Sequence, residues 1–122
     1  MDRKIEQNNW TTFLKEFNKR NGGRPTRLEV FGEEIGVETE EHGFPLSGID
    51  IEMKGKDSPS IEIMLGGKEQ DLNHLTHVIT NVKQIMVKEG EDENETILEI
   101  ESQDNVKTLL YIEPIQKIGK SQ

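Results

Sequence analysis

The sequence has no cysteine, no alanine and only six aromatic residues among its 122 residues. The absence of cysteine excludes disulfide bonds, thiolate metal sites and cysteine nucleophiles. No apolar run approaches the roughly 20 residues that a transmembrane helix needs, and no secretory apolar segment follows Met1. These absences predict a cytoplasmic protein without a membrane anchor.

The apolar residues that are present favour β-structure. Ile, Val and Thr are abundant, and β-branched side chains lose rotamer freedom in helices but pack well on pleated sheets. Mean hydropathy is low, at −0.73. Ile, Val, Leu and Phe nevertheless make up about 26% of the chain, above the roughly 20% that marks chains unable to fold. We therefore expect one folded domain over residues 1–122.

The formal net charge is −9. A field of this sign repels phosphate backbones and anionic lipid headgroups, so the composition predicts no binding to nucleic acid or to membrane surfaces. High net charge often serves solubility alone. An alternative is that an acidic face mimics nucleic acid and occupies a basic partner, in which case binding would weaken strongly with salt.

An amphipathic helix is predicted over about 9–21. Four apolar side chains recur there at i, i+3, i+4 and i+7, namely Trp10, Phe13, Leu14 and Phe17. The segment Asn21-Gly22-Gly23 supplies a left-handed stop, and Pro25 prevents the helix from resuming. Three of the six aromatic residues lie on this stripe, so we expect the helix to cover a core.

Apolar and polar residues alternate through most of the sequence from 25 to 113, which is typical of strands with one buried face. The alternating segments are 26–31, 35–40, 49–54, 61–65, 84–88, 96–100 and 106–112. A turn is predicted at 42–45, and short loops favour antiparallel neighbours. The sequence thus predicts an α+β fold: the N-terminal helix, then a mostly antiparallel curled sheet or small barrel of about seven strands, and a frayed tail over 115–122.

Residues 68–80 fit a short helix or 3₁₀ turn better than a strand, because their leucines and isoleucine are spaced by three and four. Asp71, His74 and His77 follow one another at intervals of three. On a helix they share one face and could hold a divalent metal; on a strand the odd separations scatter them. No fourth ligand is evident, and hydrogen bonds from the histidines to backbone or water are the alternative.

Two arginines, Arg24 and Arg27, flank Pro25 after the Gly-Gly turn. Guanidinium groups offer two parallel donors, so the pair could clamp a carboxylate or a phosphate. Strand alternation places the two side chains on opposite sides, however. The alternative is a helix stop and a stiff turn whose arginines pair with the many carboxylates of the chain.

Several apolar side chains fall on the face that the alternation assigns to solvent. They are Phe31, Met64, Ile97, Leu109 and Tyr111. If they cluster, they form a patch suited to a protein partner, to a second copy of the chain or to the N-terminal helix. Docking of the helix and self-association are both open at this point.

Six segments together resemble a small family of bacterial proteins that is described only as a domain of unknown function. They are W-x-x-F-L at 10–14, N-x-G-R-P-T-R-L-E-V at 21–30, P-L-x-G-I at 45–49, I-x-I-x-L-G at 61–66, H-L-T-H-x-I at 74–79 and L-E-I-E at 98–101. The resemblance implies a bacterial cytosolic domain that stands alone. It implies no activity, substrate or catalytic residue.

We interpret the chain as a non-enzymatic binding or protein-interaction domain without a cofactor, since no nucleophile-elbow or phosphate-loop motif is present. The candidate site for a small ligand lies near four residues, Arg24, Arg27, His74 and His77. The competing hypothesis is a metal-dependent or small-molecule-processing module that uses Asp71, His74 and His77. Loss of activity on chelation would favour that second class.

Overall fold

The structure is a computed structural model that describes residues 2–32, 36–66, 74–89 and 96–113, with only the backbone over 36–42. Within these ranges the chain forms one α-helix, α1 (Trp10–Asn21), which follows a 3₁₀ turn, η1 (Gln7–Asn9). It also forms eight strands. The strands are β1 (Arg3–Ile5), β2 (Pro25–Gly32), β3 (Gly36–Glu52), β4 (Ser60–Gly66), β5 (His74–Ile79), β6 (Val82–Glu89), β7 (Thr96–Ser102) and β8 (Lys107–Ile112).

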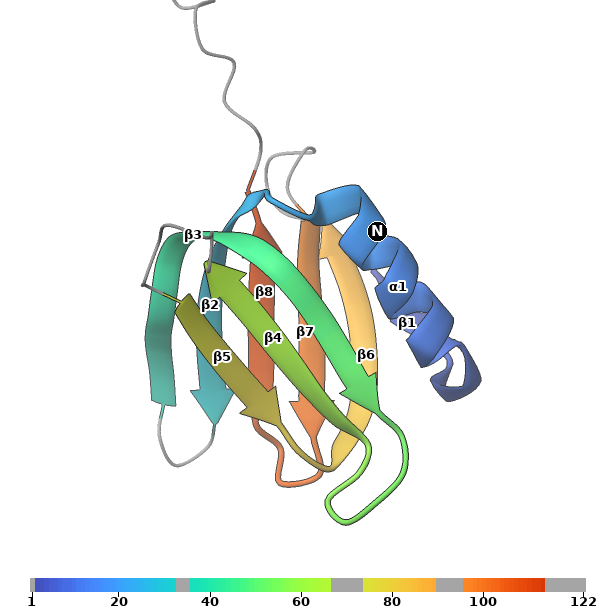
Figure 1. The fold of residues 1–122 in the computed structure, drawn as a ribbon. Coiled ribbons are helices and arrows are strands. Elements are labelled where there is room, and N and C mark those ends of the chain that lie inside the picture. Colours follow the sequence, from blue (N-terminus) through green and yellow to red (C-terminus); the bar gives the residue numbers. More distant parts are fainter. Residues whose placement is uncertain (1, 33–35, 67–73, 90–95, 114–122) are drawn as a thin grey trace, which may run out of the picture.

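All eight strands belong to one open antiparallel sheet with the order β1-β6-β7-β8-β2-β3-β4-β5. The long strand β3 joins its two parts: the first half of β3 pairs with β2 and the second half with β4. The backbone of Gly43, at an irregularity near the end of the pairing with β2, has a φ of +88°, which glycine adopts without steric cost. The sheet folds over on itself, so that β4 and β5 lie in front of β8 and β2 in Figure 1.

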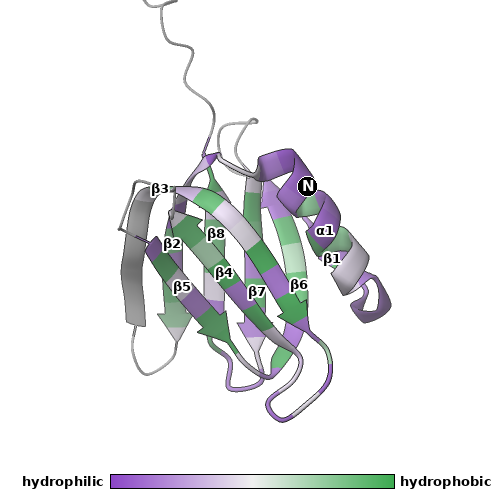
Figure 2. Cartoon of the chain, in the orientation of Figure 1, coloured by the Kyte–Doolittle hydropathy of each residue, from purple (hydrophilic) through white to green (hydrophobic). Residues whose placement is uncertain are grey.

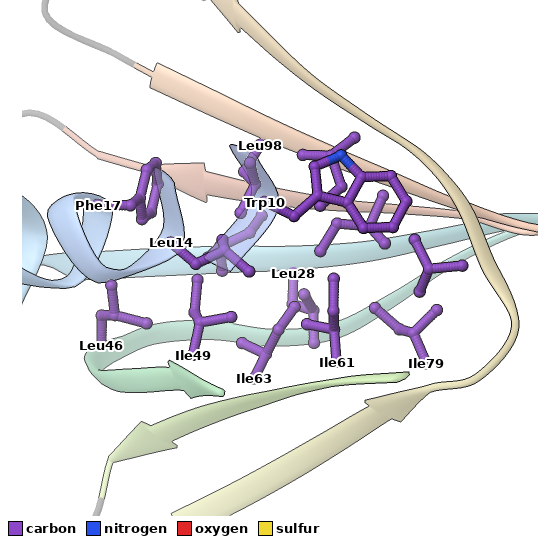
Figure 3. Close-up of a cluster of buried hydrophobic side chains, with 14 of the residues drawn as sticks. Trp10, Leu14, Phe17, Leu28, Leu46, Ile49, Ile61, Ile63, Ile79 and Leu98 are labelled. Carbon is purple, nitrogen blue, oxygen red and sulfur yellow. The ribbon is translucent and has the colours of Figure 1, made fainter. Parts of the chain in front are cut away.

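The helix α1 closes the open side of this curled sheet. Its side chains Trp10, Leu14 and Phe17 are at most 2% exposed and point between the two layers of strands (Figure 3). They form one core with apolar residues from both layers, such as Leu28 on β2 and Ile63 on β4. The surface of α1 turned away from the strands is largely hydrophilic (Figure 2). The predicted helix is confirmed, and three of the four side chains of its apolar stripe are buried; the fourth, Phe13, is half-buried.

A side chain of α1 also completes the edge of β3. The Asn18 amide donates from Nδ2 to the carbonyl oxygen of Ile49 at 2.9 Å and accepts at Oδ1 from the Ile49 N–H at 2.9 Å. A carboxamide paired in this way replaces the peptide group of a neighbouring strand. The second half of β3 therefore keeps its hydrogen bonds at Ile49 although its other strand neighbour, β4, lies on the opposite side.

The α+β fold with a curled antiparallel sheet is confirmed, but two local predictions are wrong and one strand was not predicted. The chain does not turn at 42–45, because β3 runs through this stretch, where Gly43 has a positive φ at an irregularity in the pairing with β2. Of the helix or 3₁₀ turn predicted over 68–80, residues 74–79 are instead the strand β5, because pairing along β4 outweighs their spacing; residues 68–73 lie outside the described residues. The strand β1, of three residues, was missed because it is too short to show alternation.

Candidate functional site

A pocket of about 380 Å³ lies beside α1, next to its buried stripe. Phe13, Phe17, Arg20 and Asn21 line it from the helix, at i, i+4, i+7 and i+8, which is one face of a helix. The other described lining residues are Arg3 on β1, Arg24 in the turn after α1, Val87 on β6 and Thr96 on β7. We call this the arginine pocket.

The arginine pocket concentrates positive charge in a protein whose net charge is −9. Arg3, Arg20 and Arg24 are three of the four arginines of the chain. No carboxylate is among the lining residues that the structure describes. Because the chain has 24 acidic residues and only 15 lysines and arginines, this local excess of cations runs against the composition and makes the pocket attractive to an anion.

The backbone and side chain of Arg24 are held in place by neighbouring elements. Its Nη2 donates to the carbonyl oxygen of Glu113 at 2.8 Å, and Nη1 donates to Asn21 Oδ1 at 3.4 Å. Asn21 is buried and donates in turn to the carbonyl oxygen of Phe17 at 3.1 Å. Arg24 Nε is buried and has no hydrogen-bond partner among the described residues. Arg24 is therefore preorganised and keeps unused donor capacity.

One wall of the arginine pocket is apolar. The rings of Phe13 and Phe17 lie 5.8 Å apart at a tilt of 44°, and Val87 lines the pocket from β6. The guanidinium carbon of Arg3 lies 5.9 Å from the centre of the Phe13 ring, within cation–π range. Cationic and apolar surfaces thus meet inside one pocket.

A second groove, of about 370 Å³, lies on the other side of α1. Its lining includes Lys15 from the helix together with the carboxylates of Asp50, Glu52 and Glu62 from β3 and β4. This excess of negative charge in its described lining makes the groove a poor site for an anion.

Arg27 does not line the arginine pocket. Its guanidinium stacks on the Tyr111 ring at 3.6 Å and bonds to Glu29 Oε2 through Nη1 at 2.6 Å; Arg27 Nε lies 3.5 Å from Glu113 Oε2. Burial lowers the pKa of Arg27, but Glu29, Tyr111 and Glu113 together hold it above the ordinary value. Arg27 is paired with carboxylates, as the alternative interpretation expects, and is not combined with Arg24 in one clamp.

Tyr111, the only tyrosine of the chain, provides a pH-dependent test of this outer cluster. Burial raises the pKa of Tyr111, and the hydrogen bond from its hydroxyl to Glu29 Oε1, at 3.1 Å, raises it further. The folded pKa lies above the unfolded value of about 10. The stabilisation is therefore fully present below pH ~10 and is lost as pH rises through the folded pKa.

We expect the tyrosinate absorbance of the native protein to titrate above pH ~10 and that of the urea-unfolded chain near 10. Glu29→Gln should lower the native midpoint, because it removes the carboxylate that disfavours tyrosinate. Glu52→Gln, an exposed change on β3, is the control and should leave the midpoint in place. Equal midpoints in the native and the unfolded protein would contradict the expectation.

The histidines of the predicted site lie far along the sheet from Arg24. His74 and His77 are both on β5, which is separated from β2 by β3 and β4. On this strand a separation of three places their side chains on opposite faces, with His74 exposed and His77 half-buried. Asp71, the third residue of the metal hypothesis, lies outside the described residues. Within the described part of the chain, no group of three or more potential ligands is placed to hold a metal ion.

Four of the five apolar side chains predicted on the outer face lie close together. Ile97 is directly opposite Tyr111, and Leu109 and Phe31 continue the row diagonally across β8 and β2. Met64 lies apart, on β4. The four clustered side chains are half-buried, and α1 packs on the opposite, inner face. Docking of the helix on this cluster is therefore wrong, and self-association through it stays a prediction.

Sequence reasoning identified Arg24 but missed Arg3, Arg20 and Phe13 as members of the same pocket. A signal was available, because all four arginines fall within the first 27 residues and every later cation is a lysine. Phe13 and Arg20 also lie on one helix face, seven residues apart. The contribution of Arg3 depends on β1, which pairs Arg3 with Val87 and so brings it to the pocket.

Fold and pocket define an α+β domain in which one helix closes an open antiparallel sheet and an arginine-rich pocket lies beside that helix. The chain belongs to a family of unknown function (DUF5335), whose sequence model matches residues 1–120. Neither the curated proteins nor the solved structures gave a match. The helix within the described ranges is too short and too polar to cross a membrane.

Proposed function

We propose that this protein is a non-enzymatic binding domain that holds an anionic small molecule in the arginine pocket. The observation that carries the proposal is the charge of the lining: three arginines, and no carboxylate among the described lining residues, in a chain of net charge −9. Arginine suits this role because its planar guanidinium donates two parallel hydrogen bonds to a carboxylate or a phosphate. A bacterial cytosolic setting is part of the proposal, since the family resemblance implies it.

The arrangement of the arginines supports binding rather than a purely structural role. Arg27 shows what a structural arginine of this chain does, because its guanidinium is stacked and paired with two carboxylates. Arg3 and Arg20 are exposed at the rim of the pocket, and Arg24 donates only to a backbone carbonyl and to an amide oxygen. Among the described residues, no ion pair neutralises their charges, and a bound anion would do so.

The test is thermal unfolding in sodium phosphate against sodium chloride at matched ionic strength. At a phosphate concentration ten times its Kd, a ligand that binds only the folded state adds about 1.4 kcal/mol. For a chain of this size that corresponds to a rise in Tm of roughly 3–6 °C. Titration calorimetry with inorganic phosphate then gives the affinity itself.

Variants locate the site. Arg3→Gln and Arg20→Gln alter exposed side chains and should each weaken phosphate binding about fivefold, which is ~1 kcal/mol, while leaving the fold intact. Arg24→Gln should weaken it further but also removes two internal hydrogen bonds. Lys15→Gln makes the same change of charge on the opposite side of α1 and is the control. An identical Tm in phosphate and chloride, or equal binding by Arg20→Gln and Lys15→Gln, would refute the proposal.

A further inference from the structure

We infer that the ligand of the arginine pocket is an organic anion, with a carboxylate or phosphate group on a compact apolar body, and not an inorganic ion. The inference rests on the proposed function and adds the chemical class of the ligand. It follows from three features of the pocket: its apolar wall, the positions of its cations, and its size.

The apolar wall offers surface that an inorganic anion would not use. Phe13, Phe17 and Val87 are the apolar lining residues; Phe17 is almost fully buried, whereas Phe13 and Val87 remain half-buried although both pack against the core. Covering such surface is favourable by about 25 cal/mol per Å² of apolar area removed from water. An inorganic anion is strongly hydrated and would gain nothing from this wall. A ligand with a ring or a branched hydrocarbon part would cover it.

The cations lie on three different elements around that wall. Arg3 is on β1, Arg20 is in the last turn of α1, and Arg24 is in the turn that follows. The guanidinium of Arg3 lies 5.9 Å from the Phe13 ring, so a group bound by Arg3 is next to an aromatic surface. Arg24 is held by its hydrogen bonds to Asn21 Oδ1 and to the carbonyl oxygen of Glu113, which fixes the position of the third cation. A ligand that contacts both the arginines and the apolar wall must therefore carry an anionic group and an apolar part in one molecule.

The size of the pocket limits the apolar part. At about 380 Å³ the arginine pocket is near the lower end of the range of about 300–1,000 Å³ that is typical of ligand sites. One ring or a short branched chain bearing one anionic group fits this space. Carboxylate and phosphate groups can both accept two parallel hydrogen bonds from a guanidinium. The test therefore compares the two head groups directly.

The experiment is titration calorimetry with two matched pairs of probes, phenyl phosphate against inorganic phosphate and benzoate against acetate. Within at least one pair we expect the aromatic member to bind about tenfold more tightly. Val87→Thr keeps the shape of the side chain but makes it polar, and should remove most of that advantage without changing the affinity for inorganic phosphate. Val78→Thr, at an exposed valine on β5, is the matched control and should change neither affinity.

A second variant tests the apolar wall from a different element, in case Val87→Thr disturbs β6 locally. Phe13→Leu keeps an apolar side chain on α1 but removes the ring, and should again lower the affinity for the aromatic probe alone. Equal affinities within both pairs would overturn the inference and leave the proposed anion site standing. An aromatic preference that survives both variants would also overturn the inference, because it would place the ligand elsewhere. The absence of binding by all four probes would remove the inference and the proposed function together.

Discussion

Replacing Trp10 by alanine should lower the free energy of unfolding by about 3–5 kcal/mol, the largest loss that we expect from a single substitution in this chain. Trp10 is 2% exposed and lies between the two layers of the sheet (Figure 3). Its indole Nε1 also donates to the buried carbonyl oxygen of Ile5 at 2.9 Å. Alanine would leave both a cavity and an unpaired carbonyl. Because domains of this size are stable by only about 5–15 kcal/mol, the variant should be close to unfolding.

The measurement is urea unfolding followed by circular dichroism, since the variant lacks the only tryptophan. Trp10→Phe separates the two contributions: it keeps most of the apolar volume but leaves the Ile5 carbonyl without its donor, which costs about 1–3 kcal/mol. Val78→Ala, at a side chain 51% exposed, should stay within about 0.5 kcal/mol of the natural protein. A loss below ~1 kcal/mol for Trp10→Ala would show that the helix is not anchored in this core.

Substitution of Trp10 by phenylalanine should affect the arginine pocket as well as the stability of the fold. The indole bond to Ile5 ties β1 to the start of α1, and β1 carries Arg3. Trp10→Phe should therefore weaken phosphate binding even where the protein remains folded, since Arg3 would lose part of its positioning.

Asn18→Leu should lower the free energy of unfolding by about 1–3 kcal/mol, the second largest effect that we expect. Leucine is similar in volume but removes both hydrogen bonds to Ile49, so the N–H and the carbonyl oxygen at this edge of β3 lose their partner. Water reaches part of this half-buried site, which keeps the cost below that of a fully buried pair. Lys19→Leu, an exposed change one residue along α1, is the control and should have little effect.

Asn18→Asp gives this prediction a pH signature. A carboxylate can still accept from the Ile49 N–H, but it faces the Ile49 carbonyl oxygen where the amide donated. The folded state therefore favours the protonated acid and raises its pKa above the unfolded value of about 4. Relative to the natural protein, Asn18→Asp should be least stable at neutral pH and should recover as pH falls through that raised pKa. Urea unfolding at pH 7 and pH 4 measures the difference; equal deficits at the two values would contradict it.

The local elements of this protein could be predicted because short-range patterns specify them. The stripe of Trp10, Leu14 and Phe17 has the period of a helix and is buried as one. The stop after Asn21 was predictable because Gly23, at a φ of +83°, adopts the left-handed backbone that glycine tolerates. The strict alternation of 96–100 and 106–112 likewise predicted β7 and β8, which pair with each other.

Where the local spacing of apolar residues and the available strand pairing favour different structures, the strand pairing determines the structure. Residues 74–79 have a spacing that suits a helix, yet they form β5 because β4 offers a row of backbone partners from Ile61 to Gly66. The chain continues as β3 through 42–45 because β2 pairs with both His42 and Pro45, with Gly43 at the irregularity between them, and β4 takes up the pairing from Leu46 onward. Both outcomes depend on strands that are distant in sequence, and no local window contains that information.

The sequence alone determined the class of the fold, the helix and its buried face, and the unusual placement of every arginine before residue 28. Only the tertiary structure decided which arginines line one pocket. It joins Arg3 to Arg24 through the pairing of β1 with β6 and the position of α1, and it assigns Arg27 to the carboxylates and Tyr111 of the outer face. The physical reason is that a pocket is formed by side chains from several elements, and their distances are fixed by sheet order and helix docking rather than by spacing along the chain.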